Sequence, residues 1–220
     1  MTEKFSVKVL VFSASLRSNS LNDRLATLAT RSVESFGGTV DRAHMADFDC
    51  PSYDGDDERD GLPEGATRLR DRLLGSDGFI IVSPEYNASM PGVLKNVIDW
   101  TSRFRPQPFT RRYGMLMSAS PSMVGGNRGL WSLRIPLEHL GARVYPDMFS
   151  LAQAHQAFNS EGRIADAKLQ QRFDETISCW MQSVEAAKHY PMMKTQWVEF
   201  LGERPTPEID RVEETEVRAA

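Results

Sequence analysis

Three polar segments of the sequence hold residue types that could bind a small charged ligand. The first, residues 13–22, reads SASLRSNSLN and contains four serines, two asparagines and Arg17. Hydroxyls, an arginine and the free N–H groups at the start of a following helix suit a phosphate dianion. Neither the dinucleotide-binding glycine pattern nor a Walker loop is present, which disfavours a pyrophosphate or a triphosphate. A plain helix N-cap at Asn19 or Ser20 is the alternative.

The second and third segments could contact the flat part of a ligand. Residues 83–92 (SPEYNASMPG) are stiffened by two prolines, so their backbone groups could read the edge of a heterocycle while Tyr86 packs on its face. A turn whose tyrosine docks into the core is the alternative. Residues 118–128 (SASPSMVGGNR) hold paired glycines, which permit close backbone approach to a ligand, although a flexible loop has the same composition. Arg128 could meet a phosphate of a nicotinamide cofactor or form a surface ion pair. Together the segments favour a mononucleotide with a planar ring.

Alternating strand-like and helix-like runs must position these segments. Mostly apolar runs predict strands at residues 8–13, 78–83 and 113–118. Residues 39–44 could form another strand, and residues 143–145, which could extend to residue 150, are expected to form the fifth. Helical spacing predicts helices at residues 21–36, 65–74, 93–101, 130–140 and 169–184, with a long surface loop at residues 45–63. Pro136 predicts that its helix either starts late or is kinked.

The alternation predicts an α/β fold with a parallel sheet and helices on both faces, because parallel strands need crossover connections. Ligands of such sheets bind at the carboxyl ends of the strands. The three polar segments follow the first, third and fourth predicted strands. We therefore expect one ligand to touch all three.

Composition narrows the class of protein. The 220 residues are 40% hydrophobic and 25% charged with a formal net charge of −4, which is ordinary for a globular protein of one to two domains. The charge disfavours nucleic acid as the main partner, and no apolar run approaches the roughly 18 residues that span a bilayer. The chain starts without a signal-peptide pattern, and Cys50 and Cys179 match no zinc or disulfide spacing. We expect a cytoplasmic protein with two free thiols, no metal site and no membrane association.

The second segment and the helix after it carry the most specific signal. Residues 84–100 read PEYNASMPGVLKNVIDW and resemble the PEYNxSxPGxLKNxIDW motif of the NADPH-dependent FMN reductase family. Residues 14–22 are similar to that family's GSxRxxSxN motif, and Gly125-Gly126 to its paired glycines. The resemblance extends over about residues 8–184. The family includes bacterial chromate, quinone and azo-dye reductases.

The resemblance implies a fold, a cofactor and its contacts. The fold would be a flavodoxin-like three-layer sandwich with a five-stranded parallel sheet of order 2-1-3-4-5, over residues 1–190, followed by a C-terminal extension at residues 191–220. Each subunit would bind one FMN, whose phosphate would be held by Ser15, Arg17, Ser20 and Asn22. The ring and ribityl chain would contact Pro84, Glu85, Tyr86, Asn87, Ser118, Ala119 and Ser120. The flavin would lie near a homodimer interface that includes residues 91–103, and two dimers could form a homotetramer.

The implied function is that of an FMN-dependent NAD(P)H oxidoreductase. Hydride would pass from NADPH or NADH to FMN and then to a small acceptor such as a quinone, a flavin, an azo compound or chromate. The cofactor carries this chemistry, so no catalytic side chain is predicted. Two alternatives stay open: an FMN-binding electron carrier or sensor without NAD(P)H turnover, and a flavin-free interaction protein with the same fold. Single-domain carriers are typically more acidic, so the mild net charge favours the reductase.

Two features depart from the family pattern. Ala14 replaces the usual first glycine, which would strain the chain only if φ were positive there. We expect a negative φ and no effect. No family motif matches the chain after Tyr190, where residues 192–201 predict a short amphipathic helix with Trp197 in an oligomer contact. The polar residues from 202 onward are expected to be disordered or to lie across a partner.

Overall fold

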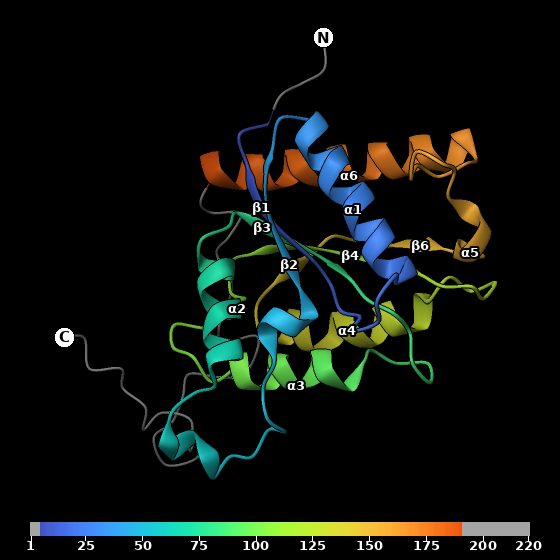
Figure 1. Ribbon diagram of the computed structural model, residues 1–220. Helices are drawn as coiled ribbons and strands as arrows, with labels where there is room; N and C mark the ends of the chain where they lie inside the picture. The colour runs from blue at the N-terminus through green and yellow to red at the C-terminus, as the bar shows by residue number, and fades with distance from the viewer. Residues whose placement is uncertain (1–4, 191–220) are drawn as a thin grey trace.

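A parallel sheet forms the middle layer of the computed structural model, which describes residues 5–190 (Figure 1). The strand order is β2-β1-β3-β4-β5, and a short β6 also pairs with β4. The predicted order 2-1-3-4-5 is therefore confirmed. The strands span β1 Lys8–Ser13, β2 Thr39–His44, β3 Gly78–Val82, β4 Tyr113–Ala119, β5 Arg143–Val144 and β6 Phe149–Leu151.

The fifth strand lies where it was predicted, but its possible extension to residue 150 is wrong, because the edge of the sheet is built from two pieces. β5 pairs with Tyr113 and Gly114 at the start of β4, whereas β6 pairs with the last residues of β4, from Met117 to Ala119. Pro146 lies between the two pieces. A proline has no N–H to donate to the ladder, so strand pairing is interrupted there and resumes at Phe149.

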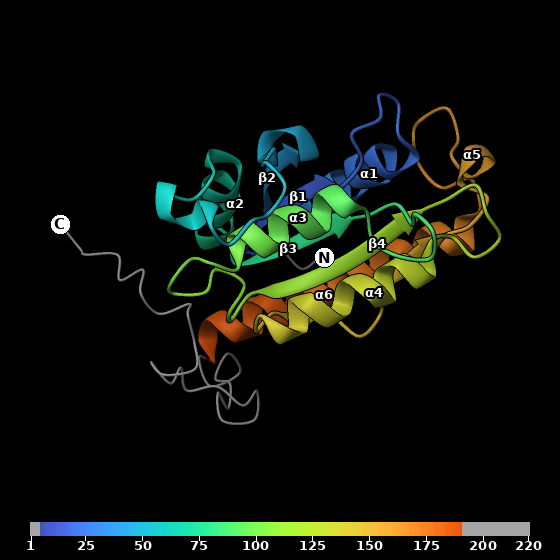
Figure 2. The same ribbon diagram turned by 90° about the horizontal axis from the view of Figure 1, so that it is seen from below.

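Helices cover both faces of the sheet (Figures 1 and 2). Apolar side chains of α1 and α6 pack on one face together with Val9 and Val11 of β1. Side chains of α2, α3 and α4 pack on the other face with Leu10 and Phe12. This alternation along β1 is the two-residue period of a strand buried on both sides. The helices span α1 Leu21–Ser35, α2 Glu64–Leu74, α3 Gly92–Thr101, α4 Asn127–His139, α5 Ala154–Ala157 and α6 Ala167–His189.

Three helical details differ from the prediction. The expected loop at residues 45–63 contains two short 3₁₀ helices, η1 Met45–Phe48 and η2 Asp57–Asp60. The four-residue α5 was not predicted. α4 begins at Asn127, before the predicted residue 130, so Pro136 lies inside the helix and the late start, one of the two alternatives, is wrong. The first turn of α4 contacts the second of the loops discussed in the next subsection, and helical spacing does not reveal that contact.

The C-terminal end of α6 is fastened at the edge of the sheet opposite the carboxyl ends of the strands. Lys188 Nζ donates to the carbonyl oxygen of Ser6 (2.6 Å) and pairs with Asp77 (3.1 Å). Asp77 also accepts from the backbone N–H of Lys8 at 2.8 Å, so the start of β1 shares this cluster. The predicted helix at residues 192–201, with Trp197, lies outside the described residues, and the division at residue 190 stays a prediction.

Both cysteines are free thiols, Cys179 exposed on α6 and Cys50 half-buried after η1. Burial raises the pKa of the Cys50 thiol. Over residues 5–190 no helix is both long and apolar enough to cross a bilayer. The same residues contain no group of three potential His, Cys, Asp or Glu ligands for a metal ion.

Candidate functional site

The three predicted loops gather at one end of the sheet, where β1, β3 and β4 finish (Figure 1). We refer to residues 14–20 as the first loop, residues 83–91 as the second and residues 120–126 as the third. Each runs from the carboxyl end of a strand to the start of a helix, α1, α3 or α4. In a parallel α/β sheet this edge is where ligands bind.

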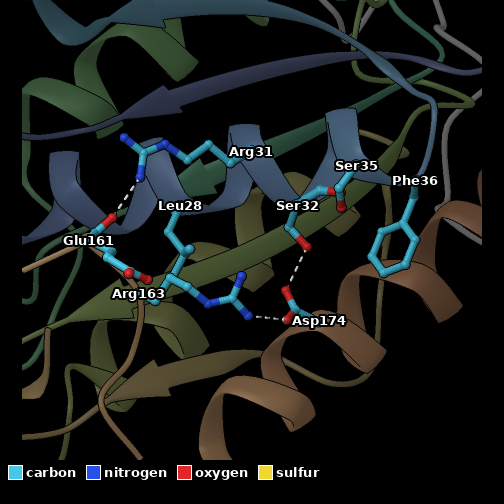
Figure 3. A pocket seen from close by; sticks show the side chains of 8 residues that line it. All are labelled: Leu28, Arg31, Ser32, Ser35, Phe36, Glu161, Arg163 and Asp174. Atoms are coloured by element: carbon cyan, nitrogen blue, oxygen red, sulfur yellow. Dashed lines mark hydrogen bonds and ion pairs between the residues drawn. The ribbon is translucent and has the colours of Figure 1, made fainter. Parts of the chain in front are cut away.

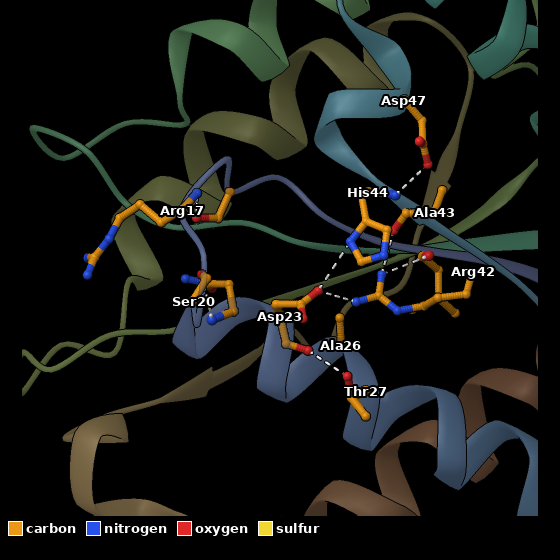
Figure 4. Close-up of polar contacts among 12 residues, drawn as sticks. Arg17, Ser20, Asp23, Ala26, Thr27, Arg42, Ala43, His44 and Asp47 are labelled. Carbon is orange, nitrogen blue, oxygen red and sulfur yellow. Dashed lines mark hydrogen bonds and ion pairs between the residues drawn. The ribbon is translucent and has the colours of Figure 1, made fainter.

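The first loop presents a cation at the start of α1. Ser20 is the N-cap, and its hydroxyl accepts the backbone N–H of Asn22 at 3.2 Å. The hydroxyl of Ser15 accepts the N–H of Arg17 at 3.3 Å. The exposed Arg17 guanidinium makes no ion pair with any residue in the described part of the chain, and Figure 4 shows it pointing away from the neighbouring charges. An unpaired arginine beside a helix N-terminus is suited to an anion.

Ala14 fits its position without strain. Its φ is not positive, its side chain is buried, and its N–H donates to the carbonyl oxygen of Val82 at 2.9 Å. The expected negative φ is confirmed, and this backbone conformation does not require glycine.

Asn22 lies beneath the first loop and ties it to the end of β4. Its side chain donates to the carbonyl oxygen of Ala119 at 3.0 Å and accepts the N–H of Ala119 at 2.9 Å. Asn22 is buried, and both polar ends of its side-chain amide are engaged in this contact. A contact between Asn22 and a phosphate stays a prediction.

The second loop ends in a tight hairpin turn. Tyr86 and Ser89 exchange two backbone hydrogen bonds of 2.9 and 3.0 Å, and the two residues between them, Asn87 and Ala88, have φ values of 52° and 62°. Two consecutive positive φ values are typical of a type I′ turn. The Tyr86 side chain is 47% exposed, so the alternative in which it docks into the core is wrong. Its ring is accessible to a planar ligand, whereas Pro84 is buried under the turn.

Glu85 turns its carboxylate toward α4. Oε1 accepts from Nε and Nη2 of Arg128 at 2.9 and 2.8 Å, and Oε2 accepts the N–H of Gly129 at 3.0 Å. Burial opposes ionisation, but the Gly129 N–H and the Arg128 guanidinium outweigh it and hold the pKa of Glu85 below its ordinary value. Of the two roles considered for Arg128, the structure shows the ion pair.

The third loop needs its paired glycines. Gly125 and Gly126 have φ values of 66° and 84°, in the left-handed region that favours glycine. A Cβ atom on Gly126 would collide with the hydroxyl of Ser118. Ser118 is fully buried beneath this glycine, and its hydroxyl has no hydrogen-bond partner among the described residues. Ser120 lies at the rim, where its hydroxyl contacts that of Ser122 at 3.1 Å.

The residues at the three loops fit FMN. The unpaired Arg17 and the hydroxyls at the start of α1 match a phosphate, and the exposed Tyr86 matches a planar ring. The hydroxyl of Ser118 is buried under Gly126 of the third loop and has no hydrogen-bond partner among the described residues, so it could bond to a ligand that approaches this glycine closely. The first and third loops also expose the apolar side chains of Leu16, Met123 and Val124.

One charged group beside the first loop was missed by the sequence analysis. Asp23 in the first turn of α1 pairs with Arg42 Nη2 (2.5 Å) and approaches His44 Nδ1 (3.7 Å), as Figure 4 shows. Arg42 also donates to the carbonyl oxygens of Val11 and Ala43. The group fastens α1 to the end of β2. No local motif signals it, because its members come from separate elements.

A cavity of about 370 Å³ lies elsewhere, between α1 and α6 (Figure 3). Asp174 accepts from Ser32 (2.9 Å) and pairs with Arg163 (3.4 Å). Arg31 donates to the carbonyl oxygen of Glu161 at 2.9 Å. These polar groups are paired with other groups of the protein. The cavity is therefore a weaker candidate for ligand binding than the three loops.

Comparison with known proteins identifies relatives of the chain. Residues 7–156 match the family described as NADPH-dependent FMN reductase. An NAD(P)H-dependent FMN reductase of Pseudomonas aeruginosa is 33% identical over 173 residues, which are 78% of this chain and 91% of that protein. A quinone reductase of Escherichia coli K12 is 36% identical over 149 residues, which are 66% of this chain and 75% of that protein.

Solved structures agree with these relatives. A flavoenzyme NAD(P)H:(acceptor) oxidoreductase from Paracoccus denitrificans has a TM-score of 0.71 at 28% identity, over 82% of this chain and 98% of that one. An NADH:FMN oxidoreductase in its apo form has a TM-score of 0.61 at 22% identity, over 81% and 90% of the two chains, and supports the fold alone. The flavodoxin-like fold and the oxidoreductase class using FMN and NAD(P)H, both predicted from the sequence, are confirmed. The chain belongs to the NADPH-dependent FMN reductase family.

Proposed function

We propose that the chain binds one FMN per subunit across its three loops and uses it to pass electrons from NAD(P)H to a small acceptor. The observation that carries this proposal is that the unpaired guanidinium of Arg17, before the start of α1, and a tight hairpin with an exposed tyrosine lie at the same edge of the sheet. These two features match the two ends of a mononucleotide with a planar ring.

The chain's own residues bind and orient the cofactor. Arg17, Ser15 and Ser20 would hold the phosphate at the N-terminus of α1, with Asn22 fixing the loop from below. Residues of the second and third loops would border the ring and ribityl chain, namely Pro84, Glu85, Tyr86, Asn87, Ser118, Ala119 and Ser120. Bound FMN would supply the two-electron chemistry, taking hydride from NADPH or NADH and reducing the acceptor. No side chain has to act as a general acid or base.

The names of the relatives favour a quinone or a free flavin as the acceptor. Azo compounds and chromate stay within the proposal, because an exposed flavin face discriminates weakly among oxidants. An electron carrier without NAD(P)H turnover is the competing function. The cytoplasmic location expected from the sequence stays a prediction.

We also propose that the functional unit is a dimer or a tetramer. α3 and α4 expose the large apolar side chains Val93, Trp131 and Ile135 to solvent, which supports a second copy packing on this face. Changing Trp131→Asp should lower the molar mass measured by sedimentation equilibrium. An unchanged mass would place the contact on another surface.

Anaerobic mixing of the purified yellow holoprotein with NADPH tests the reductase function. We expect the visible absorbance of the oxidised flavin to bleach within one turnover. A flavin that stays oxidised with both NADPH and NADH, while dithionite reduces it, would favour the electron carrier. Restoration of the absorbance by a quinone completes the reaction.

Replacing Arg17→Ala tests the phosphate contact. The loss of a hydrogen bond to a charged group should weaken FMN binding by roughly 1.5–3 kcal/mol, about 10- to 150-fold in Kd. Fluorescence titration of the apoprotein measures this change. Arg59→Ala, an exposed arginine in η2, is the matched control and should leave the Kd unchanged. An unchanged Kd for Arg17→Ala would show that Arg17 does not contact the phosphate.

A further inference from the structure

The helix α4 starts without a cap of its own. Its N-cap residue is Gly126, which has no side chain to accept the free N–H groups of the first turn. Glu85, from the second loop, takes over this function. Its carboxylate accepts the N–H of Gly129 at 3.0 Å and two guanidinium N–H groups of Arg128 at 2.8 and 2.9 Å.

Close backbone approach makes this contact possible. A Cβ atom on Gly129 would lie 3.0 Å from the Cβ of Glu85 and 3.1 Å from its Cα, which is tighter than ordinary packing. The first turn of α4 therefore sits directly on the backbone of the second loop. The Glu85 side chain is only 10% exposed. A carboxylate in such a place is stable in its ionised form because hydrogen bonds replace the lost water.

The contact joins two walls of the candidate site. Glu85 immediately precedes the exposed Tyr86, and Gly126 ends the third loop. Any shift of the Glu85 backbone relative to α4 changes the spacing between these loops. The first loop is fastened separately, through Asn22 and Ala119.

We propose that Glu85 is a positioning residue of the flavin site, which caps α4 from the second loop and so sets the spacing in which the isoalloxazine ring binds. The inference rests on the proposed FMN binding. In this arrangement the Glu85 carboxylate binds α4, and the backbone of the second loop faces the ring. Glu85 thus supports the ring half of the site and leaves the phosphate half unaffected.

Titration of the apoprotein with FMN and with riboflavin, which lacks the phosphate, tests this division. We expect Glu85→Gln to raise both dissociation constants by the same factor, about tenfold for a lost charged hydrogen bond, and Glu85→Asp to recover part of the loss. Arg17→Ala should weaken FMN binding alone. Glu138→Gln is the matched control, because Glu138 pairs with Arg134 (2.7 Å) farther along α4, and it should change neither constant.

Each outcome decides the proposal. If Glu85→Gln folds and binds both flavins as the wild type does, or weakens only FMN, Glu85 does not position the ring. If that variant does not fold, Arg128→Gln decides instead, since it leaves the Gly129 contact in place and should raise both constants by a smaller, equal factor of about three. An unchanged Arg128→Gln protein would then overturn the proposal. A wild-type protein that binds neither flavin would refute the proposed function itself.

Discussion

Two side chains hold the loops of the site together, and they do so with opposite chemistry. Asn22 is neutral and buried, and both ends of its amide bind the backbone of one residue, Ala119. Glu85 is ionised and binds a backbone N–H and the Arg128 guanidinium, whose side chain is 62% exposed. The first contact joins α1 to β4, and the second joins the loop after β3 to α4.

This difference predicts which of the two contacts should depend on pH and salt concentration. A buried amide exchanging two backbone hydrogen bonds has no charge to titrate or to screen. A carboxylate paired with an exposed arginine depends on both pH and salt. The first loop is thus held by the insensitive contact, and the second loop by the sensitive one.

Removing the Asn22 contact should have the largest effect on stability. Asn22→Ala leaves the N–H and the carbonyl of Ala119 buried without partners, which should lower the free energy of unfolding by roughly 2–4 kcal/mol. Urea denaturation of the apoprotein measures this. Thr27→Ala, an exposed site on the same helix, should stay within about 0.5 kcal/mol of the wild type. A comparably small loss for Asn22→Ala would show that water replaces the amide.

The Glu85 contact should make the free energy of unfolding depend on pH. Because the folded-state pKa of Glu85 is lowered from its ordinary 4.5, the ionised carboxylate stabilises the fold above that value, and this contribution is lost as the pH falls through the lowered pKa. The unfolding free energies of wild type and Glu85→Gln should differ by roughly 1–2 kcal/mol at neutral pH. The gap should close below pH 4.5, whereas the gap for Asn22→Ala should not. If the stability differences of both variants from the wild type disappear at the same low pH, the two contacts do not differ in their pH dependence.

Salt should have the smallest effect. A double-mutant cycle of Glu85→Gln and Arg128→Gln measures the coupling between the two side chains. Raising NaCl from about 0.1 to 1 M should reduce this coupling by roughly 0.5 kcal/mol, because the arginine is largely exposed. A coupling that does not change with salt would mean that the pair is shielded as thoroughly as Asn22.

Local patterns were sufficient where neighbouring residues decide the structure. The strands at residues 8–13 and 39–44 have their predicted bounds, because the apolar run of the first and the Gly37-Gly38 pair before the second are local signals. The break between β5 and β6 has a local cause, because Pro146 lies between them in the sequence. Its effect on the sheet depends on how both pieces pair with β4. Local spacing alone could not predict that pairing.

The contacts that shape the site were beyond the reach of local patterns. Asn22 and Ala119 are 97 residues apart, and Glu85 and Gly129 are 44 apart. Motifs brought these residues to attention as flavin contacts. Their side chains point into the protein, however, because the N–H groups of β4 and α4 needed acceptors. The backbone groups that need a side chain as hydrogen-bond partner can be identified only when the packing of the helices and strands is known.

The two thiols differ in reactivity, so a dye can be attached at a chosen position outside the three loops. Cys179 is exposed on α6, while the half-buried Cys50 thiol has a raised pKa and so carries less of the reactive thiolate at neutral pH. A maleimide dye should therefore attach first to Cys179, on the face of the sheet opposite α3 and α4. Energy transfer between that dye and the flavin would follow cofactor binding without altering any of the three loops.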